Sequence, residues 1–184
     1  NRALWNARVP LHLNSRMYDV DGFIAGRNSL TAIELELLGE VRGKRILHLQ
    51  CHFGQDTLSL ARMGAEVTGL DISDVALDEA RKLADRCGLK ADWVCSNVID
   101  HRPELDGRFD IVITSYGTIG WLPDVKPWAA NIARYLKPGG RFVFVEFHPA
   151  LWMFDNAFTH VQYSYFNRGT IVEEEEGTYA DRQA

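Results

Sequence analysis

Short apolar runs alternate with longer amphipathic segments along the middle of the chain. The runs have the length of β-strands and are bounded by polar or glycine residues; they cover residues 46–49, 67–72, 93–95, 109–113 and 142–147. Helix signals lie between them, after Gly54, from Ser73 to Gly88 and from Asp124 to Leu136. Because strands that alternate with helices are joined by right-handed crossovers, this pattern predicts an α/β fold with a mainly parallel, twisted sheet and helices on both faces.

Another helix is predicted before the first strand. Thr31 and Glu34 have the spacing of a capping box. Apolar residues recur around them at helical spacing, at Leu30, Ile33, Leu37, Leu38 and Val41. Ser73 or Asp74 can cap the helix that ends at Gly88. The residues of this helix expected to face the core are Ala76, Ala80, Leu83, Ala84 and Cys87.

The last part of the chain is rich in aromatic residues and departs from the alternation. Residues 161–166 and 170–172 are β-prone runs on either side of Asn167-Arg-Gly169, which predicts a β-hairpin. We interpret the 184 residues as one domain with three parts: a helical cap (1–43), a core (44–149) and an aromatic-rich lid or interface segment (150–184). A homodimer contact through residues 150–176 is one prediction for that segment.

Composition and charge restrict the class of protein. Apolar residues make up 46% and charged residues 24% of the chain, which disfavours disorder, collagen-like repeats and coiled coil. The net charge of −5 provides no basic field for nucleic acid. Neither a membrane span nor a signal peptide is expected, because no apolar run is long enough and no signal pattern begins the sequence. Cys51, Cys87 and Cys95 lack metal-ligand spacing, so we expect small buried cysteines, no metal site and a cytoplasmic location.

Polar residues follow three of the predicted strands, at the positions where parallel sheets bind ligands. The first strand leads into residues 50–57, a loop and a helix N-terminus with exposed backbone N–H groups. Asp71 ends the second strand about twenty residues later, where a carboxylate can accept hydrogen bonds from ribose hydroxyls. After the third strand, Asn97 can pair with an adenine amine while Ile72 and Val98 sandwich the ring. Together these strand ends predict a site for an adenosine moiety.

From residue 45 to residue 147, the chain resembles the class I S-adenosylmethionine-dependent methyltransferases, which have a Rossmann-like fold. The resemblance rests on the loop ending at Gly54, Asp71, the Asn97 region, the strand Phe109-Asp-Ile-Val-Ile-Thr-Ser115 and the turn Leu136-Lys-Pro-Gly-Gly140. In the family this turn joins a helix to the fifth strand, with Pro138 ending the helix and the glycine pair permitting a positive φ. The resemblance implies S-adenosylmethionine as the methyl donor and S-adenosylhomocysteine as the product.

The resemblance also implies roles for individual residues. Asp71 would bind the ribose, Asn97 with Val98 the adenine edge, and the backbone from Gln50 to Gly54 the methionine part. The residues expected to bind the cofactor are Gln50, Cys51, His52, Gly54, Asp56, Asp71, Ile72, Asn97, Val98, Ser115 and Tyr116, the last two at the reacting end. The reaction would be an in-line displacement on the sulfonium methyl, which needs alignment of the reactants but no metal.

The loop after the first strand departs from the family pattern. The family has approximately Asp-x-Gly-x-Gly-x-Gly, whereas His48-Leu-Gln-Cys-His-Phe-Gly54 keeps only the last glycine. Larger residues fit such a loop without strain only while their φ angles stay negative. Gln50 or Asp56 can hydrogen-bond the cofactor's amino group through its side chain instead. After residue 150 we find neither the closing helix nor the antiparallel strand pair of the family, so the last strands are expected to be missing.

Other side chains are candidates for the acceptor side. His148 follows the fifth predicted strand and is placed either to act as a general base or to form a structural turn. Trp121 and Tyr18 are candidates for contact with a small-molecule acceptor, with ordinary packing as the alternative for both. His48, inside the first strand, is expected to be a hydrogen-bonded core residue, whereas His52 is better placed for catalysis.

Two other functions are compatible with the predicted fold. A nicotinamide-dependent oxidoreductase needs G-x-G-x-x-G in the first loop, which Cys51-His-Phe-Gly54 does not provide. A non-catalytic nucleotide-binding or scaffold protein is harder to distinguish, because a fold does not determine a function. Detection of methyl transfer to any acceptor would exclude that second alternative.

Overall fold

Five parallel β-strands form the centre of the computed structural model, which describes residues 1–169, 171 and 178–180. The strands are β1 (Arg45–Leu49), β2 (Glu66–Asp71), β3 (Asp92–Cys95), β4 (Phe109–Ser115) and β5 (Leu136–Val145). Their order in the sheet is β3-β2-β1-β4-β5, and all neighbouring pairs are parallel. The strand order therefore reverses direction between β1 and β4, which is where open sheets of this kind bind ligands. The predicted α/β fold with a parallel sheet is confirmed.

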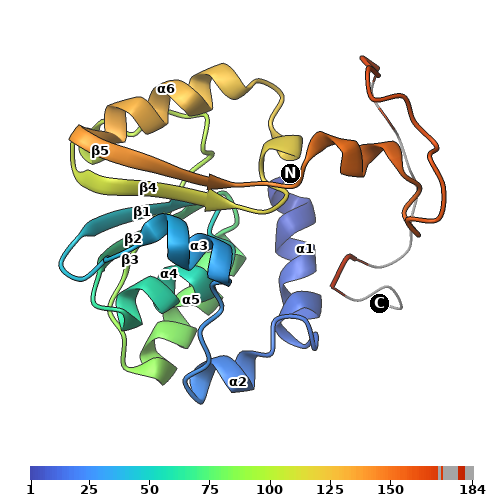
Figure 1. Ribbon diagram of the computed structural model, residues 1–184. Helices are drawn as coiled ribbons and strands as arrows, with labels where there is room; N and C mark the ends of the chain where they lie inside the picture. Colours follow the sequence, from blue (N-terminus) through green and yellow to red (C-terminus); the bar gives the residue numbers. More distant parts are fainter. Residues whose placement is uncertain (170, 172–177, 181–184) are drawn as a thin grey trace.

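Helices cover both faces of the sheet (Figure 1). The helices α3 (Ala32–Leu38), α4 (Gln55–Arg62) and α5 (Asp74–Cys87) lie on one face, and α6 (Val125–Tyr135) lies on the other. This division follows from right-handed connections, because the chain crosses one face while it moves from β1 to β3 and the other while it moves from β4 to β5.

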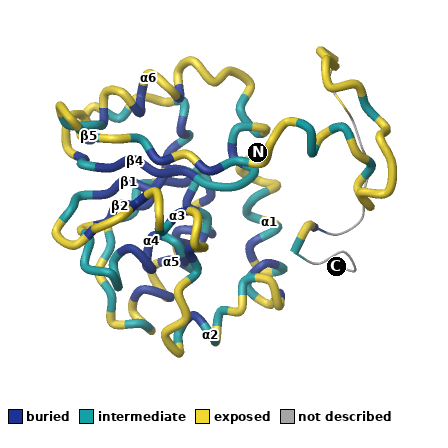
Figure 2. The backbone as a smooth tube through the Cα atoms, viewed as in Figure 1, coloured by how far each residue is buried: buried dark blue, intermediate teal, exposed yellow. Residues whose placement is uncertain are grey.

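The central strands are buried on both faces, as Figure 2 shows by their colour. Successive residues of β1 point to opposite sides. Ile46 belongs to an apolar cluster with Leu38 and Leu60, on the face of α3 and α4. Leu47 belongs to a second cluster with Trp128, on the face of α6. The sheet thus separates two apolar cores, which explains why its inner strands are almost continuously apolar.

Two helices precede α3 in the N-terminal part of the chain, α1 (Arg2–Leu13) and α2 (Val20–Ile24). The amide of Asn6 ties α1 to the start of α5: its Nδ2 donates to Asp74 Oδ1 at 2.9 Å, and its Oδ1 accepts from Ser73 Oγ at 2.6 Å. The start of α5 follows β2, so α1 lies at the edge of the sheet where the strands end (Figure 1). None of the helices in the described residues is long and apolar enough to cross a membrane.

The predicted caps are confirmed for α3 and α5, and the structure adds a cap for α6. Thr31 and Glu34 form the predicted capping box of α3. Ser73 caps α5, whose end at Gly88 has φ 65. Asp124 caps α6 by accepting from Lys126 N at 2.9 Å. These features depend on residues a few positions apart, so they can be recognised before the fold is known.

The apolar face predicted for α3 is partly wrong. Ile33 and Leu37 are 56% and 47% exposed, whereas Leu38 is fully buried. Glu34 faces the interior, because its carboxylate accepts hydrogen bonds from Thr31 at the helix start and from the hydroxyl of Tyr116. The inward face of α3 therefore carries the Glu34 carboxylate beside Leu38, whereas the apolar pattern places Ile33 and Leu37 there.

The turn before β5 differs from the expectation for Pro138. The helix α6 already ends at Tyr135, and Leu136 pairs with Phe109 of β4 before the register shifts to Arg141 opposite Ile111. Pro138 lies in this irregular part of β5 instead of ending the helix, and its ring keeps the preceding residue extended. Gly139 has φ 78, as expected of the glycine pair.

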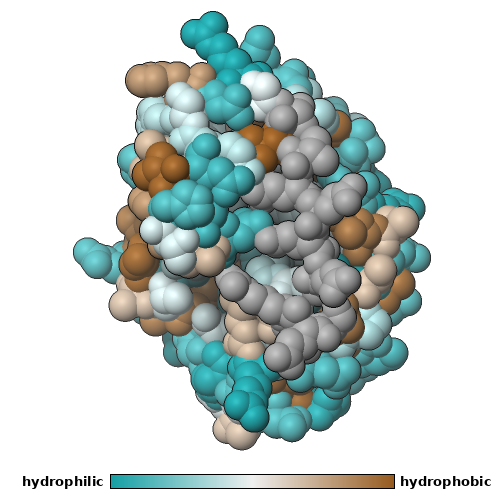
Figure 3. All heavy atoms as spheres, turned by 90° about the vertical axis from the view of Figure 1, so that its right-hand side faces the viewer, coloured by the Kyte–Doolittle hydropathy of each residue, from teal (hydrophilic) through white to brown (hydrophobic). Residues whose placement is uncertain are grey.

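The prediction of a C-terminal β-hairpin is also wrong for the described residues. Residues 161–166 form no strand; they contain one antiparallel bridge, between Phe154 and Val161, followed by turns. Residues 170 and 172 of the second predicted strand lie outside the described residues. The predicted strand has no buried face, since Phe166 is 83% exposed, and a two-stranded ribbon without such a face is marginally stable. On this side of the molecule, hydrophobic and hydrophilic side chains are mixed (Figure 3).

The cysteines occupy three different environments. Cys51 is buried as predicted and Cys87 is half-buried, but Cys95 is exposed. The expectation for Cys95 was wrong because β3 is an edge strand, so its side chains are covered less than those of β1.

Candidate functional site

The loop between β1 and α4 lies beside the reversal of strand order and contains two residues in an unfavourable conformation. Gln50 and His52 have φ values of 55° and 51°, a region that larger residues adopt rarely. The sequence predicts that larger residues fit this loop without strain only at negative φ. That condition is not met, because Gln50 and His52 have the positive φ angles typical of glycine. Two backbone hydrogen bonds hold it, from Cys51 N to Leu70 O at 3.1 Å and from Gly54 N to Cys51 O at 2.9 Å.

Gly54 is required by packing as well as by its φ of 81°. A Cβ at this position would lie 2.4 Å from the ring of Trp93 on β3 and 3.2 Å from the Cβ of Ala80 on α5. The close approach is therefore to the protein's own core. This contact accounts for the one glycine of the family loop that the chain retains.

Asp71 connects the end of β2 to this loop. Its Oδ2 accepts from His52 N at 2.7 Å, and its Oδ1 accepts from Ser73 N at 2.9 Å. The side chain is buried, which raises the pKa of the carboxyl group, while the backbone N–H groups of Ser73, His52 and Ile72 act in the opposite direction. A carboxylate has about four lone-pair positions, so further acceptor capacity remains.

The loops after β2 and β3 lie next to each other. Ser96 N donates to the backbone oxygen of Asp71 at 2.9 Å. Asn97 is half-buried, and its Oδ1 accepts from its own loop at Ile99 N, 3.4 Å away. Val98 is buried in the core cluster under α6, and its carbonyl accepts from Asn131 Nδ2 at 3.1 Å. The structure thus brings the Ile72 and Asn97 loops together, as predicted from the strand ends.

Glu146 holds the loop after β4, and the sequence did not predict it as a site residue. Its carboxylate accepts backbone hydrogen bonds from Gly117, Thr118 at 2.8 Å, Ile119 at 3.3 Å and Phe147 at 2.8 Å. Burial would raise the pKa of Glu146, but these N–H donors lower it overall. The available signal was an acidic residue near the end of the fifth predicted strand; it directly follows β5, whereas Asp71 is the last residue of β2.

Gln50 joins the first loop to the loop that Glu146 holds. Its Nε2 donates to Thr118 O at 2.9 Å, whereas its Oε1 is buried without a hydrogen-bond partner. A buried acceptor without a donor costs free energy. Gln50 therefore presents an unused acceptor at the junction of β1 and β4.

Ser115 ends β4 and leads into Tyr116, which has φ 46°. The Tyr116 hydroxyl contacts Thr31 Oγ1 at 3.1 Å and Glu34 Oε2 at 3.2 Å, so this ring is held by α3. Asp56, in the first turn of α4, is close enough to Glu34 for their charges to interact, and burial raises its pKa. The two acids lie on the same side of the site as Tyr116.

One face of α1 lines the site, and no sequence argument identified it. Asn1, Trp5, Arg8 and His12 recur at helical spacing. Asn1 Nδ2 donates to the backbone oxygen of Trp121 at 3.0 Å, and the Trp5 ring lies 5.3 Å from that of Trp121. His12 Nδ1 lies 2.8 Å from His52 Nε2. The spacing of these four residues was the signal that could have been used.

His12 and His52 are held as neutral imidazoles. Burial lowers the pKa of His12 to about 4, with a smaller contribution from the charge of Arg8. Burial likewise lowers the pKa of His52 to about 3, with His12 contributing. His12 is fully buried, and its Nε2 has no hydrogen-bond partner.

Tyr18 packs against this histidine pair. Its ring stacks on His12 with centroids 5.3 Å apart and lies 4.8 Å from Phe53. Its hydroxyl is 2.6 Å from that of Tyr179, and burial raises the pKa of Tyr18 well above its usual range. Tyr18 and Trp121, both predicted as acceptor contacts, therefore lie on the two sides of the same group of rings.

Comparison with known proteins identifies the family. A methyltransferase domain model matches residues 46–140, just over half of the chain. The chain belongs to this methyltransferase domain family. It is 31% identical over 134 residues to the ubiquinone biosynthesis O-methyltransferase of Proteus mirabilis, covering 71% of this chain and 54% of that protein. The chain thus spans about half the length of the curated relatives it matches.

Solved structures agree with this assignment. An S-adenosylmethionine-dependent methyltransferase from Mesorhizobium loti is 30% identical, with a TM-score of 0.59 over 72% of this chain and 58% of that one. A TehB-like methyltransferase from Corynebacterium glutamicum is 26% identical, with a TM-score of 0.61 over 75% of this chain and 72% of that one. The Rossmann-like fold expected for the methyltransferase domain is therefore confirmed.

Two histidines of the methyltransferase domain have local partners. His48 is buried, as predicted, with Nδ1 2.8 Å from Thr57 Oγ1. His148 is exposed and caps the short helix η3 (Pro149–Met153) by accepting from Ala150 N at 3.2 Å. Because Nδ1 accepts in this cap, a neutral His148 carries its proton on Nε2, and it can take up a proton only when Nδ1 leaves Ala150 N.

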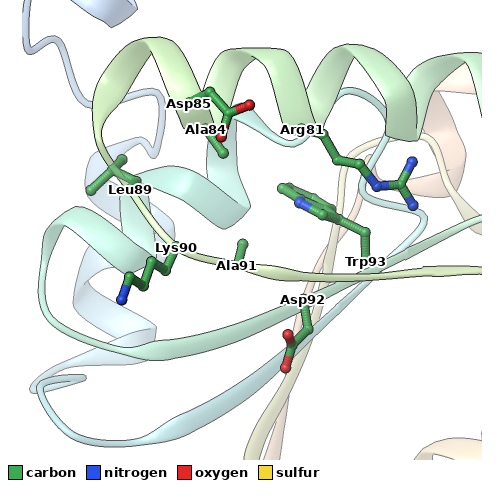
Figure 4. A pocket seen from close by; sticks show the side chains of 8 residues that line it. All are labelled: Arg81, Ala84, Asp85, Leu89, Lys90, Ala91, Asp92 and Trp93. Atoms are coloured by element: carbon green, nitrogen blue, oxygen red, sulfur yellow. The ribbon is translucent and has the colours of Figure 1, made fainter.

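A surface groove of about 500 Å³ lies away from these residues. It is formed by the second half of α5 and the start of β3, including Arg81, Asp85 and Trp93 (Figure 4). The start of a parallel strand is opposite to the edge that carries Asp71. This groove is therefore separate from the candidate site of the methyltransferase domain.

Proposed function

We propose that this chain binds S-adenosylmethionine at the carboxyl ends of β1, β2 and β3 and uses it to methylate a small-molecule acceptor. The observation that carries the proposal is the pair of backbone hydrogen bonds that hold the Asp71 carboxylate at the end of β2, one of them from the adjoining loop. Membership of the methyltransferase domain family supports it.

The nucleoside would be bound by the loops after β2 and β3. Asp71 has acceptor positions left for the two ribose hydroxyls, since its known donors are backbone N–H groups. Ile72 and Asn97 lie on adjacent loops, where an adenine ring would contact the first and hydrogen-bond to the second. Val98 would act mainly through its backbone and through packing, because its side chain lies in the core.

The amino-acid part fits the loop after β1. The free Oε1 of Gln50 and the carboxylate of Asp56 provide acceptors for an ammonium group. Of the backbone N–H groups from Cys51 to Gly54, those of Cys51, His52 and Gly54 are bonded within the protein, so the N–H of Phe53 would contribute to this surface. His52 would contact the cofactor through the same loop, in which its N–H is already used by Asp71.

S-adenosylmethionine supplies the transferable methyl group when it is bound. The protein aligns the acceptor with that group and excludes water. Ser115 and Tyr116 border the reacting end, with Trp121 and Tyr18 on the acceptor side. His148 is the candidate base for an acceptor that must lose a proton, as a hydroxyl acceptor of an O-methyltransferase would. Its Nδ1 would have to release Ala150 N to receive that proton. The name of the Proteus mirabilis relative, a ubiquinone biosynthesis O-methyltransferase, is the reason to favour a small-molecule acceptor.

Calorimetric titration with S-adenosylhomocysteine tests the proposal. We expect saturable, micromolar-range binding to the unchanged protein and none to NAD. Asp71→Ala should weaken binding by at least about tenfold, whereas Asp85→Ala, an exposed aspartate on α5, should not. Circular dichroism verifies that both variants are folded. Absence of S-adenosylhomocysteine binding to the unchanged protein would refute the methyltransferase proposal and favour a non-catalytic role for the fold.

A further inference from the structure

Arg8 carries a positive charge into the group of rings beside the cofactor loop. Its guanidinium carbon lies 5.4 Å from the ring centroid of Trp5 and 5.3 Å from that of Trp121. Both distances are within the range of cation–π attraction. The side chain is half-buried and belongs to the face of α1 that carries His12. The two indoles therefore fix the position of the guanidinium group.

The charge of Arg8 has no anionic partner among the described residues. Most other arginines of that part of the chain bind an oxygen atom through their guanidinium groups. The acceptor is a carboxylate or a backbone carbonyl for Arg27, Arg45, Arg62, Arg81, Arg86, Arg102, Arg108 and Arg141. Arg134 binds the side-chain amide oxygen of Asn131. For Arg8, the contacts in the same part of the chain are the two indole rings. Its charge reaches its neighbours. Burial raises the pKa of Tyr179 and Arg8 opposes that rise, while at His12 the charge of Arg8 adds to the lowering of the pKa by burial.

Arg8 also lies next to the proposed reacting end. Trp121 belongs to the short helix η2 (Ile119–Trp121), which follows the loop held by Glu146. Trp5 lies 5.6 Å from the ring of His52, whose backbone N–H is bound to Asp71. Trp5 thus connects Arg8 to the loop after β1, and Trp121 connects it to the segment after β4.

We propose that Arg8 binds a carboxylate group at the reacting end of this site. Cation–π contact with the two indole rings uses none of the guanidinium N–H groups as hydrogen-bond donors to an anion, so they can still bind a carboxylate in a bidentate way. The inference rests on the proposed function and specifies its ligand chemistry. The carboxylate belongs either to the acceptor or to the methionine part of the cofactor.

Three variants separate the charge of Arg8 from its shape. Arg8→Gln removes the charge, and Arg8→Lys keeps it without the planar fork. Arg16→Gln is the matched control, because Arg16 follows the same helix and is exposed. Each is titrated with S-adenosylhomocysteine and with 5′-methylthioadenosine, which has the nucleoside but no carboxylate. The S-adenosylhomocysteine complexes are then titrated with benzoate and with neutral benzamide.

The two sources of the carboxylate give different results. If it is the cofactor's, Arg8→Gln weakens S-adenosylhomocysteine by about tenfold to a hundredfold and leaves 5′-methylthioadenosine unchanged. If it belongs to the acceptor, Arg8→Gln leaves S-adenosylhomocysteine unchanged and abolishes a benzoate binding that benzamide does not show. Arg8→Lys should fall between Arg8→Gln and the unchanged protein in either case.

The inference is overturned if Arg8→Gln and Arg16→Gln behave alike with both S-adenosylhomocysteine and benzoate. Failure of the proposed function would be visible separately, as a lack of S-adenosylhomocysteine binding to the unchanged protein. In that case, benzoate and benzamide titrations of the free protein still test Arg8, and equal results for the two ligands would overturn the inference as well.

Discussion

The Oδ2 atom of Asp71 accepts a hydrogen bond from the backbone nitrogen of His52 at 2.7 Å, which joins the end of β2 to the loop after β1. His52 is one of the two larger residues with positive φ in that loop. The same carboxylate caps the turn after β2 through Ser73 N. One buried side chain therefore sets the position of two loops, and its removal should affect stability as well as ligand binding.

Asp71→Asn should lower the free energy of unfolding by about 1–3 kcal/mol. The amide has a single oxygen, so it can satisfy His52 N or Ser73 N but presents an N–H group to the other. Urea unfolding measures the change. Asp85→Asn, at an exposed position on α5, is expected to have almost no effect. Equal stability of Asp71→Asn and the unchanged protein would show that Asp71 does not hold the loop.

Gly54→Ala should be more destabilising than Gly88→Ala. Both glycines have positive φ, 81° and 65°, but an added Cβ at Gly88 meets open space whereas one at Gly54 lies 2.4 Å from Trp93. We expect about 1–2 kcal/mol for Gly88→Ala from the backbone alone, and a further loss of about 1–3 kcal/mol for Gly54→Ala from overpacking. Thermal or urea unfolding compares the two variants.

A second substitution tests the cause of that difference. Trp93→Leu removes the ring that the new Cβ would meet, so the loss caused by Gly54→Ala should be smaller in the Trp93→Leu background. If the losses in the two backgrounds are equal, the clash with Trp93 is not the reason for the glycine.

Glu146→Gln should loosen the loop after β4. The carboxylate accepts from four backbone N–H groups, whereas an amide has one oxygen and directs N–H donors at the remaining ones. Amide hydrogen exchange at residues 117–119 should accelerate by about tenfold or more. Glu36→Gln, at an exposed position on α3, is the control. Unchanged exchange in Glu146→Gln would mean that other contacts order this loop.

The free energy of unfolding should decrease as the pH is lowered from about 6.5 to about 4, because of the histidine pair. The pKa of His12 is lowered to about 4 and that of His52 to about 3, chiefly by burial. Both are depressed below the unfolded value of about 6.5, so the unfolded state binds more protons as the pH falls through this window. The two neutral histidines contribute fully to the stability of the folded state above the unfolded pKa, and this contribution declines as the pH falls towards their pKa values in the folded state.

Thermal unfolding at pH 7.5 and pH 5 measures this effect. The loss of stability should be smaller in His12→Gln than in the unchanged protein, by on the order of 1 kcal/mol. Arg16→Gln, at an exposed position after α1, should retain the full pH dependence. The same pH dependence in all three proteins would show that His12 does not contribute.

The sequence by itself determined the features that depend on neighbouring residues. Apolar runs located all five strands to within a few residues, apart from the early start of β5. Spacing between near residues identified the cap at Thr31 and placed the next cap at Ser73 or Asp74, of which Ser73 is the cap in the structure. The position of Asp71 followed because the end of an apolar run is also the end of a strand, and parallel strands end at one edge of the sheet.

Only the tertiary structure decided which distant residues meet. His12 contacts His52 across 40 positions of the sequence, and Glu146 binds a loop about thirty positions earlier. The positive φ of Gln50 and His52, the interior position of Glu34 and the missing hairpin strand at 161–166 also depend on surrounding contacts. A hydrophobic pattern reports which face of an element is buried, but a hydrogen bond requires two groups at one distance and angle. That geometry exists only after the elements have packed.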